Sequence, residues 1–393
     1  MVPHTNSLAV FRLLVAGGSL AAICHAQTSG TPPPAPEKSP PAAAAPAPAP
    51  PAAAPSPPAP AAEKPGPAQE RTAPASDKEA KPLDLAEVRK KAEAGDAESQ
   101  LNLADLIFSG AVKDAKYEEA SALVEKASDS GYPPAQLAFS RLLRLGGAGV
   151  KADLERSRFL VQQAAEAGDA AAQAAYGSLL MSQVDTKSRD VDFAEPLRWY
   201  RLAADQGNPE GTCRLGMMRA AGQGGEADPK AAWALISKAA RVGHSLALNE
   251  AGICLQKGLG VDKDAIAAIG YFHASADLGN VTGMVNLGSC YRNGNGVPRN
   301  LKKAAEVFAL AAKSNFGPGH YLLAEMQERG EGVPVDRVAA CISYMRAAAA
   351  GMAGAKERYE SVKAALSEAQ LKEVEAAMPR KATDPAAEPA KAK

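Results

Sequence analysis

The sequence predicts an all-α protein, a right-handed α-solenoid of about seven helix-turn-helix repeats closed by helical caps. The main observation is a residue, nearly always glycine, that recurs every 36 to 39 positions. These positions are Gly95, Gly131, Gly168, Gly207, Gly243, Gly279, Asn315 and Gly351. A fixed period in this range is typical of stacked supersecondary units, each too small to bury its own apolar face. Such solenoids usually work by presenting a surface to a partner.

Composition is the second observation. Aromatic residues make up only 5% of the 393 residues and alanine is abundant, which suits closely packed helices. The 44 basic and 44 acidic side chains cancel, so the formal net charge is zero. Nucleic-acid binders need a basic surface that releases counterions, so we expect no nucleic-acid partner.

The first 26 residues have the features of a signal peptide. Arg12 precedes an apolar run from Leu13 to Ile23, and Ala26 offers a small residue for cleavage. The run is about a dozen residues, whereas a bilayer span needs about 20. Two alternatives remain, an uncleaved N-terminal anchor and a lipoprotein attached through Cys24. No other stretch is apolar enough to span a membrane, so we expect no transmembrane span in the mature chain.

Residues 27–82 are rich in alanine and proline, and residues 379–393 have a similar composition. Proline fixes φ and removes hydrogen-bond donors, so we expect a disordered linker and a disordered tail. An extended polyproline II linker would reach on the order of 160 Å at about 3.1 Å per residue. The linker is either a solvated arm with no role or a spacer that tethers the solenoid to the cell envelope.

The first half of each repeat has the pattern of a helix. Counted from the closing glycine, offset 4 is small and offsets 8 and 11 are apolar, and these offsets share one helix face. Offset 9 is Gly, Ala or Ser in most repeats, as at Gly216, Gly252 and Gly288. Because glycine lowers helix propensity, we expect a neighbouring helix to approach closely there.

A turn and a second helix follow. The tetrapeptides that begin at Gly258, Gly294 and Gly330 all read G-x-G-V. The first glycine suits a helix C-cap with positive φ, and the second permits a tight reversal. The next helix begins at an N-cap residue, namely Asp228, Asp264, Asn300 or Asp336. It carries aromatic residues, which are Trp199, Trp233, Phe272, Phe308 and Tyr344.

These features resemble the Sel1-like repeat family, which is tetratricopeptide-like. The shared pattern is A-x-x-x-L-G, then G-x-G-V, a following Asp and a terminal A-A-x-x-G, and it is clearest between residues 243 and 351. The first repeat lacks G-x-G-V, and the third has a longer polar loop over 182–192. The resemblance implies a solenoid over residues 83–378. It implies no reaction, because architecture unites the family.

Extra helices are expected at both ends of the array. Leu85 to Ala94 looks like a lone second helix, and Gly351 to Leu366 repeats the first-helix pattern. Ser367 and Gln370 form a capping box that opens a last helix, which ends at about Met378. Caps are expected because an end repeat would otherwise expose its apolar face.

The sequence offers little catalytic or metal chemistry. It lacks G-x-S-x-G, S-x-x-K, H-E-x-x-H, G-x-x-x-x-G-K and C-x-x-C, so we expect no enzyme activity, metal or cofactor. We expect structural or surface roles for His244, His273 and His320. Cys254 and Cys290 occupy equivalent positions in neighbouring repeats, about 8–10 Å apart. A disulfide needs Cα atoms within about 7 Å, so we expect buried free thiols.

The candidate binding surface is the concave face, lined by the first helices. By analogy with tetratricopeptide solenoids, offsets 6, 10, 13 and 14 should point to this face. The polar residues there form a predicted partner-binding groove of Arg141, Arg144, Asn249, Gln256, Lys257, Arg292, Asn293, Tyr321, Glu325, Glu328 and Arg329. A groove with basic middle repeats and acidic residues in the last repeat suits an extended or helical peptide. The alternative for each residue is an ordinary solvated helix face.

The function we expect is a non-enzymatic exported scaffold or adaptor, periplasmic or in the cell envelope, that binds a partner protein or peptide. Bacterial proteins with Sel1-like repeats often act as adaptors in envelope assembly, polysaccharide export or signalling, and the resemblance implies this as a class. One alternative is a cell-wall or glycan-binding module that uses Tyr and Trp as stacking platforms. Another is a hydrolase acting on β-lactams, an activity credited to some relatives. Here S-x-x-K and regular cysteine pairs are missing.

Overall fold

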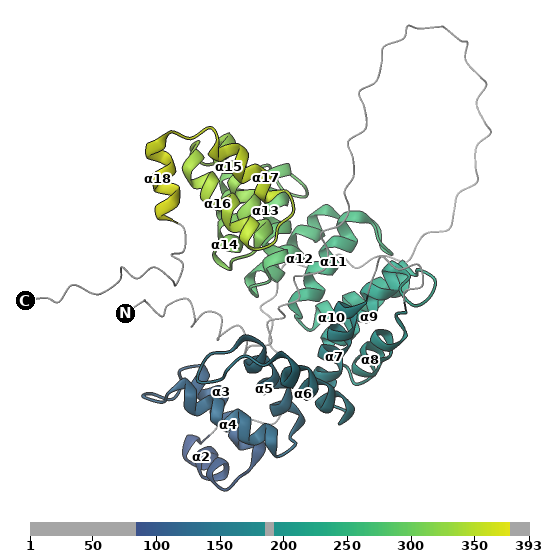
Figure 1. The fold of residues 1–393 in the computed structure, drawn as a ribbon. Helices are drawn as coiled ribbons and strands as arrows, with labels where there is room; N and C mark the ends of the chain where they lie inside the picture. Colours follow the sequence, from purple (N-terminus) through teal and green to yellow (C-terminus); the bar gives the residue numbers. More distant parts are fainter. Residues whose placement is uncertain (1–83, 185–191, 378–393) are drawn as a thin grey trace, which may run out of the picture. The chain divides into compact units, whose positions relative to one another are not determined.

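The computed structural model describes residues 84–184 and 192–377, which form seventeen α-helices (Figure 1). The only bridge within these residues pairs Gly147 with Val150. The predicted all-α fold is therefore confirmed. The expected signal peptide, linker and tail lie outside the described residues. Within the described ranges, no helix has the length and apolar character needed to cross a bilayer.

Each repeat is a pair of helices. The first helices are α3 (Ala97–Phe108), α5 (Pro133–Leu145), α7 (Ala170–Gln183), α9 (Pro209–Ala221), α11 (Ser245–Lys257), α13 (Val281–Asn293) and α15 (Gly317–Arg329). The second helices are α4 (Tyr117–Asp129), α6 (Leu154–Glu166), α8 (Ala194–Asp205), α10 (Pro229–Arg241), α12 (Ala265–Asp277), α14 (Leu301–Lys313) and α16 (Arg337–Ala349). From α2 to α17, each helix packs against the next along the chain, as a solenoid requires.

Helical caps close the array at both ends, as predicted. The N-terminal cap is α2 (Leu85–Glu93), and the C-terminal cap consists of α17 (Ala355–Lys363) and α18 (Glu368–Ala376). The capping box at Ser367 is present, because the Ser367 side chain accepts from the Gln370 backbone and the Gln370 side chain accepts from the Ser367 backbone. The last helix ends at Ala376, slightly before the predicted end.

The closing residue of each repeat has a left-handed backbone. Gly243 and Gly279 both have φ of +79°, a conformation that L side chains rarely adopt. Asn315, which replaces glycine once, keeps the same geometry with φ of +54°. Asparagine tolerates this region better than most residues, which explains the one exception in the repeat pattern.

The predicted N-caps of the second helices are also confirmed. Asp264 accepts from the backbone N–H of Ala267 at 2.9 Å, and Asn300 accepts from that of Lys303 at 3.0 Å. Asp228 caps α10 and Asp336 caps α16 in the same way. The departing first and third repeats have Lys116 and Phe193 at this position, and neither makes a side-chain cap. The sequence irregularities therefore correspond to uncapped helices.

Small residues at offset 9 receive a large side chain from the second helix of the same repeat. A Cβ placed on Gly252 would lie 2.6 Å from the Phe272 ring, and one on Gly288 would lie 2.5 Å from the Phe308 ring. The expected close approach is thus confirmed. Tyr200 and Ile236 fill the same position in earlier repeats. Trp199 and Trp233, the aromatic residues noted in the sequence, are not the equivalents of Phe272.

The second glycine of the G-x-G-V turn has a role beyond a tight reversal. A Cβ on Gly296 would lie 2.0 Å from the carbonyl oxygen of Ala265, the first residue of α12 in the preceding repeat. Gly260 approaches the Pro229 carbonyl of α10 in the same manner. The turn of one repeat therefore packs directly on the backbone of the repeat before it, where a side chain has no room.

Candidate partner-binding surface

The first helices of successive repeats contact one another, from α3 with α5 to α13 with α15. They therefore line the side on which neighbouring repeats lie closest together. Arg144, Lys257, Asn293 and Arg329 are exposed in the structure. The half-buried members of the predicted groove are Arg141, Gln256, Arg292, Tyr321, Glu325 and Glu328.

Asn249 does not belong to an accessible groove, and its prediction is corrected. It is 0% exposed, its amide nitrogen donates to Glu250 at 3.1 Å, and its oxygen accepts from Asn286 at 2.8 Å. The equivalent offset-6 residues Leu137 and Cys213 are buried as well. The analogy fails at offset 6 because the neighbouring first helix covers this position.

Arg292 joins two repeats through a network of ion pairs. Its Nη1 lies 2.9 Å from Glu325 Oε2, and its Nη2 lies 2.9 Å from Glu331 Oε2. The Arg292 and Glu325 side chains are only 17% and 18% exposed. Arg329 lies at the edge of the network, 3.8 Å from Glu325 and 3.7 Å from Glu331. The sequence analysis missed Glu331, although a charged residue between the two turn glycines was a visible signal.

Glu328 joins the last repeat to the C-terminal cap. Its Oε2 accepts from Tyr344 Oη at 3.0 Å and from Arg358 Nη2 at 2.5 Å. The Tyr344 ring packs edge to face on Tyr321, with ring centroids 5.3 Å apart. Burial raises the pKa of Tyr344 to about 12. The sequence analysis missed Tyr344 and Arg358 as partners of this cluster.

The predicted residues therefore fall into three groups: those of the last repeats, those of α5, and those of α11 and α13 outside the ion-pair network. The residues of the last repeats contact other side chains of the protein and stabilise the fold. Arg141 and Arg144 lie on α5, and two further first helices, α7 and α9, stand between them and α11. Gln256 places its amide 3.8 Å from Cys290 Sγ. Lys257 and Asn293 are exposed and make no hydrogen bond or ion pair among the described residues.

A polar row that the sequence analysis missed crosses the middle repeats. Offset 7 is Arg214 on α9, Glu250 on α11 and Asn286 on α13, whereas Ala138, Ala175 and Leu322 occupy it in three other repeats and Asn102 in the first. The signal was a run of three consecutive repeats with a polar residue at this offset. Lys257 and Asn293 follow seven residues later on the same helix faces. We call Arg214, Glu250, Lys257, Asn286 and Asn293 the middle polar row.

Arg214 is the least satisfied member of this row. Its side chain is 16% exposed, and Nη2 lies 3.6 Å from Glu210 Oε1. Its Nε and Nη2 atoms are buried and make no hydrogen bond within residues 84–184 and 192–377. The Nδ1 atom of His244 is likewise buried without a partner there, and burial lowers the pKa of His244. Buried polar atoms without a partner cost about 1–3 kcal/mol each.

The described residues show little chemistry of other kinds. Cys213, Cys254, Cys290 and Cys341 are free and buried, which confirms the expected thiols. Burial raises the pKa of Cys254 to about 11, so it is protonated and a poor nucleophile at neutral pH. The part of the chain that the structure describes holds no group of three metal-binding side chains. Trp199 is buried against Tyr176, so it is no stacking platform for a sugar.

Comparison with solved structures gives relatives of the same architecture. A protective antigen of uropathogenic Escherichia coli with an SLR fold is 26% identical with a TM-score of 0.53, and the alignment covers 75% of this chain. This chain spans 62% of the length of that antigen. A Sel1 repeat protein from Oxalobacter formigenes is 29% identical with a TM-score of 0.46, over 71% of this chain and 80% of the other. No curated protein matches the chain.

Comparison with protein families agrees with the repeat boundaries. The Sel1 repeat matches residues 97–132, 134–169, 170–208, 209–244, 245–280, 281–316 and 317–351. The matches follow one another with almost no gap and cover more than half of the chain. They also coincide with the helix pairs α3–α4 to α15–α16. The chain therefore belongs to the Sel1 repeat family.

Proposed function

We propose that this protein is a non-enzymatic scaffold or adaptor that binds a partner protein or peptide through its first helices, at the middle polar row. Solenoids of the Sel1 repeat family are commonly protein-interaction scaffolds. The array has seven matched repeats and helical caps at both ends, so its first helices offer a long surface that the fold does not bury against a further repeat.

The observation that carries the proposal is the state of Arg214. Its side chain is mostly buried, its Nε and Nη2 atoms lack hydrogen bonds, and its ion pair with Glu210 is 3.6 Å long, so a further acceptor at its accessible edge would stabilise the charge. A carboxylate is the acceptor that best matches a guanidinium. Lys257, exposed on the neighbouring first helix, adds a second positive charge. The partner segment therefore carries an acidic side chain that pairs with Arg214, with polar groups for Asn286 and Asn293.

Export belongs to the same proposal. Residues 1–26 act as a signal peptide, and residues 27–82 act as a solvated arm or, where an anchor stays at their N-terminal end, as a spacer between the solenoid and an envelope surface. The support is the sequence pattern alone. The intact mass of the mature protein separates the cases, because a start at Gln27 gives a free arm and a lipidated Cys24 gives a tether. A mass that retains residues 1–26 would argue for an anchor or against export.

A matched pair of charge reversals tests the binding surface. Lys257→Glu changes the middle polar row, and Lys302→Glu makes the same change on the second helix α14; both lysines are exposed and form no ion pair within the described residues. Arg292→Glu is unsuitable because it would break the network with Glu325 and Glu331. Each full-length variant is used to capture partners from native envelopes after crosslinking.

The expected result is a protein that wild type and Lys302→Glu capture and Lys257→Glu loses. Equal capture by both variants would remove the middle polar row from the proposal. Capture of wall polymer alone, unchanged in both variants, would favour a glycan-binding module instead.

A further inference from the structure

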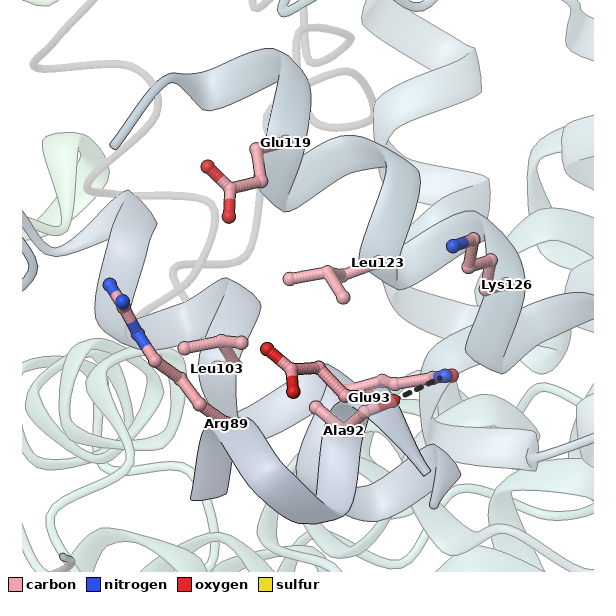
Figure 2. Close-up of a pocket in the computed structure, with 8 residues that line it drawn as sticks. Arg89, Ala92, Glu93, Leu103, Glu119, Leu123 and Lys126 are labelled. Atoms are coloured by element: carbon pink, nitrogen blue, oxygen red, sulfur yellow. Dashed lines mark hydrogen bonds between the residues drawn. The ribbon is translucent and has the colours of Figure 1, made fainter. Parts of the chain in front are cut away.

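A small cavity lies between the N-terminal cap α2 and the helices α3 and α4. It has a volume of about 210 Å³ and is lined by Arg89, Ala92, Glu93, Gln100, Leu103, Glu119, Leu123 and Lys126. Figure 2 shows the Glu93 carboxylate directed toward Leu103, with Glu119 on the opposite side of the cavity. Arg89 and Lys126 lie toward the two ends of the cavity in the same view.

The next repeat contains the same groove, between α4, α5 and α6, but there it is filled. Arg156 of α6 lies over the Phe139 ring, with its Cζ 5.0 Å from the ring centroid. Its Nη1 lies 3.1 Å from Glu125, and its Nη2 lies 3.3 Å from Asp129. An arginine side chain thus occupies this groove on an apolar floor, held by two carboxylates.

The two grooves correspond position by position when residues of α2 and α3 are counted from Gly95, those of α4 and α5 in the next groove from Gly131, and Glu119 and Arg156 from Gly131 and Gly168. Glu119 takes the place of Arg156, and Leu103 takes the place of Phe139. Glutamate is shorter than arginine and leucine is smaller than phenylalanine, so the groove at α2 stays open. Glu93 takes the place of Asp129, whereas Arg89 takes the place of Glu125, so one of the two carboxylates that hold Arg156 is retained and Glu119 supplies the second carboxylate of the open groove.

Gln100 of the lining donates to the Ala92 carbonyl at 3.1 Å, but the four charged side chains have no such partner. Among the described residues, Arg89, Glu93, Glu119 and Lys126 make no hydrogen bond or ion pair. Sites for small molecules usually measure about 300–1,000 Å³, so this cavity is too small for most metabolites. Its size suits one long side chain, whose methylenes would cover Leu103 and Leu123.

We propose that this cavity is a docking site for one arginine side chain of a partner protein or peptide. The guanidinium lies between Glu93 and Glu119, and Glu93 holds it from the position at which Asp129 holds Arg156. Planar guanidinium suits two carboxylates better than ammonium does. The site uses α2, α3 and α4, so it is separate from the middle polar row on α9, α11 and α13. Either site can fail without the other.

Methyl NMR of the full chain tests the proposal with N-acetyl-arginine amide as the probe. We expect saturable shifts of the Leu103 and Leu123 methyl signals. N-acetyl-citrulline amide has nearly the same shape without the charge, and we expect it to cause no such shifts. Equal responses to both probes, arginine shifts confined to other residues, or stronger shifts with N-acetyl-glutamate amide would each overturn the proposal.

Variants locate the site without relying on a single substitution. The double variant Glu93→Gln with Glu119→Gln should lower the affinity for the arginine probe about tenfold or more, because hydrogen bonds to charged groups are lost. Glu118→Gln changes an exposed carboxylate that does not line the cavity and should leave binding unchanged. Arg89→Ala removes a positive charge that repels the guanidinium of the probe, so this variant should bind the arginine probe at least as tightly as wild type does. Unchanged binding in the double variant would refute the assignment.

Discussion

The contact between each G-x-G-V turn and the preceding repeat can be tested with two alanine substitutions in one turn. Gly294 and Gly296 have nearly the same backbone, with φ of +78° and +72°. A Cβ on Gly294 would find its nearest neighbour at 3.5 Å, an ordinary contact, whereas one on Gly296 would lie 2.0 Å from the Ala265 carbonyl oxygen. The pair separates backbone strain from the collision with α12.

The expected costs follow from these distances. Either alanine must adopt a left-handed backbone, which costs about 1–2 kcal/mol. At Gly296 the Ala265 carbonyl must also retreat by about 1.4 Å to reach the 3.4 Å at which ordinary contact begins. Displacements of this kind in packed regions cost about 1–3 kcal/mol more. We expect Gly294→Ala to lower the free energy of unfolding by about 1–2 kcal/mol and Gly296→Ala by about 2–5 kcal/mol.

Urea unfolding followed by circular dichroism measures the difference through the shift of the transition midpoint. A repeat array can lose cooperativity when one interface weakens, so a broadened transition for Gly296→Ala alone would agree with the same reasoning. Hydrogen exchange should also become faster at the start of α12 in this variant. Equal midpoints and equal exchange for the two variants would refute the claim that this turn packs on the repeat before it.

Three further predictions concern side chains. Arg156→Ala should lower the free energy of unfolding by about 1 kcal/mol, because two exposed ion pairs and one cation–π contact are lost. Arg158→Ala, which loses one exposed ion pair, should lower it by less than about 0.5 kcal/mol. Equal shifts in the melting temperature of the two variants would contradict this. Arg292→Ala should lower the free energy of unfolding by about 1–3 kcal/mol, because it leaves the half-buried Glu325 and Glu331 with only their longer contacts to Arg329. Arg329→Ala should lower it by under about 1 kcal/mol, because this side chain is 52% exposed; urea unfolding measures both. All four thiols should resist a thiol reagent in the native protein and react on unfolding; fast native reaction at pH 8 would show that they are accessible.

The raised pKa of Cys254 also sets a direction for stability against pH. Its folded pKa of about 11 lies above the ordinary thiol value, so the protonated thiol is favoured in the folded state. The stability that it contributes is present below about pH 8.5 and is lost as pH rises toward 11. Cys254→Ala should therefore flatten the fall in unfolding midpoint between pH 8.5 and 10.5. An unchanged pH profile would contradict the buried position of this thiol.

The repeat architecture was predictable because it depends on local rules that recur. The closing glycines need a positive φ, and Asn315 meets the same need, so spacing alone located every repeat. The N-caps at Asp264 and Asn300 were visible for the same reason, since each acts within its own helix turn.

The binding surface was less predictable because it depends on contacts between repeats. Asn249 is polar and was expected to be accessible, yet the neighbouring α13 covers it through Asn286. Arg292 finds Glu331 in the following turn, a pairing that the pattern of one repeat does not contain. The open groove at α2 became recognisable only beside the filled groove that holds Arg156.

The most direct test of the proposed scaffold is site-specific photocrosslinking on the solenoid in its native envelope. A photoreactive residue at Asn293 reports on the middle polar row, and one at Lys302 reports on the second helix α14; both positions are exposed. We predict a discrete protein adduct from Asn293 that is absent from Lys302 and that Lys257→Glu abolishes. Identical adducts from both positions, or no protein adduct from Asn293, would contradict the account.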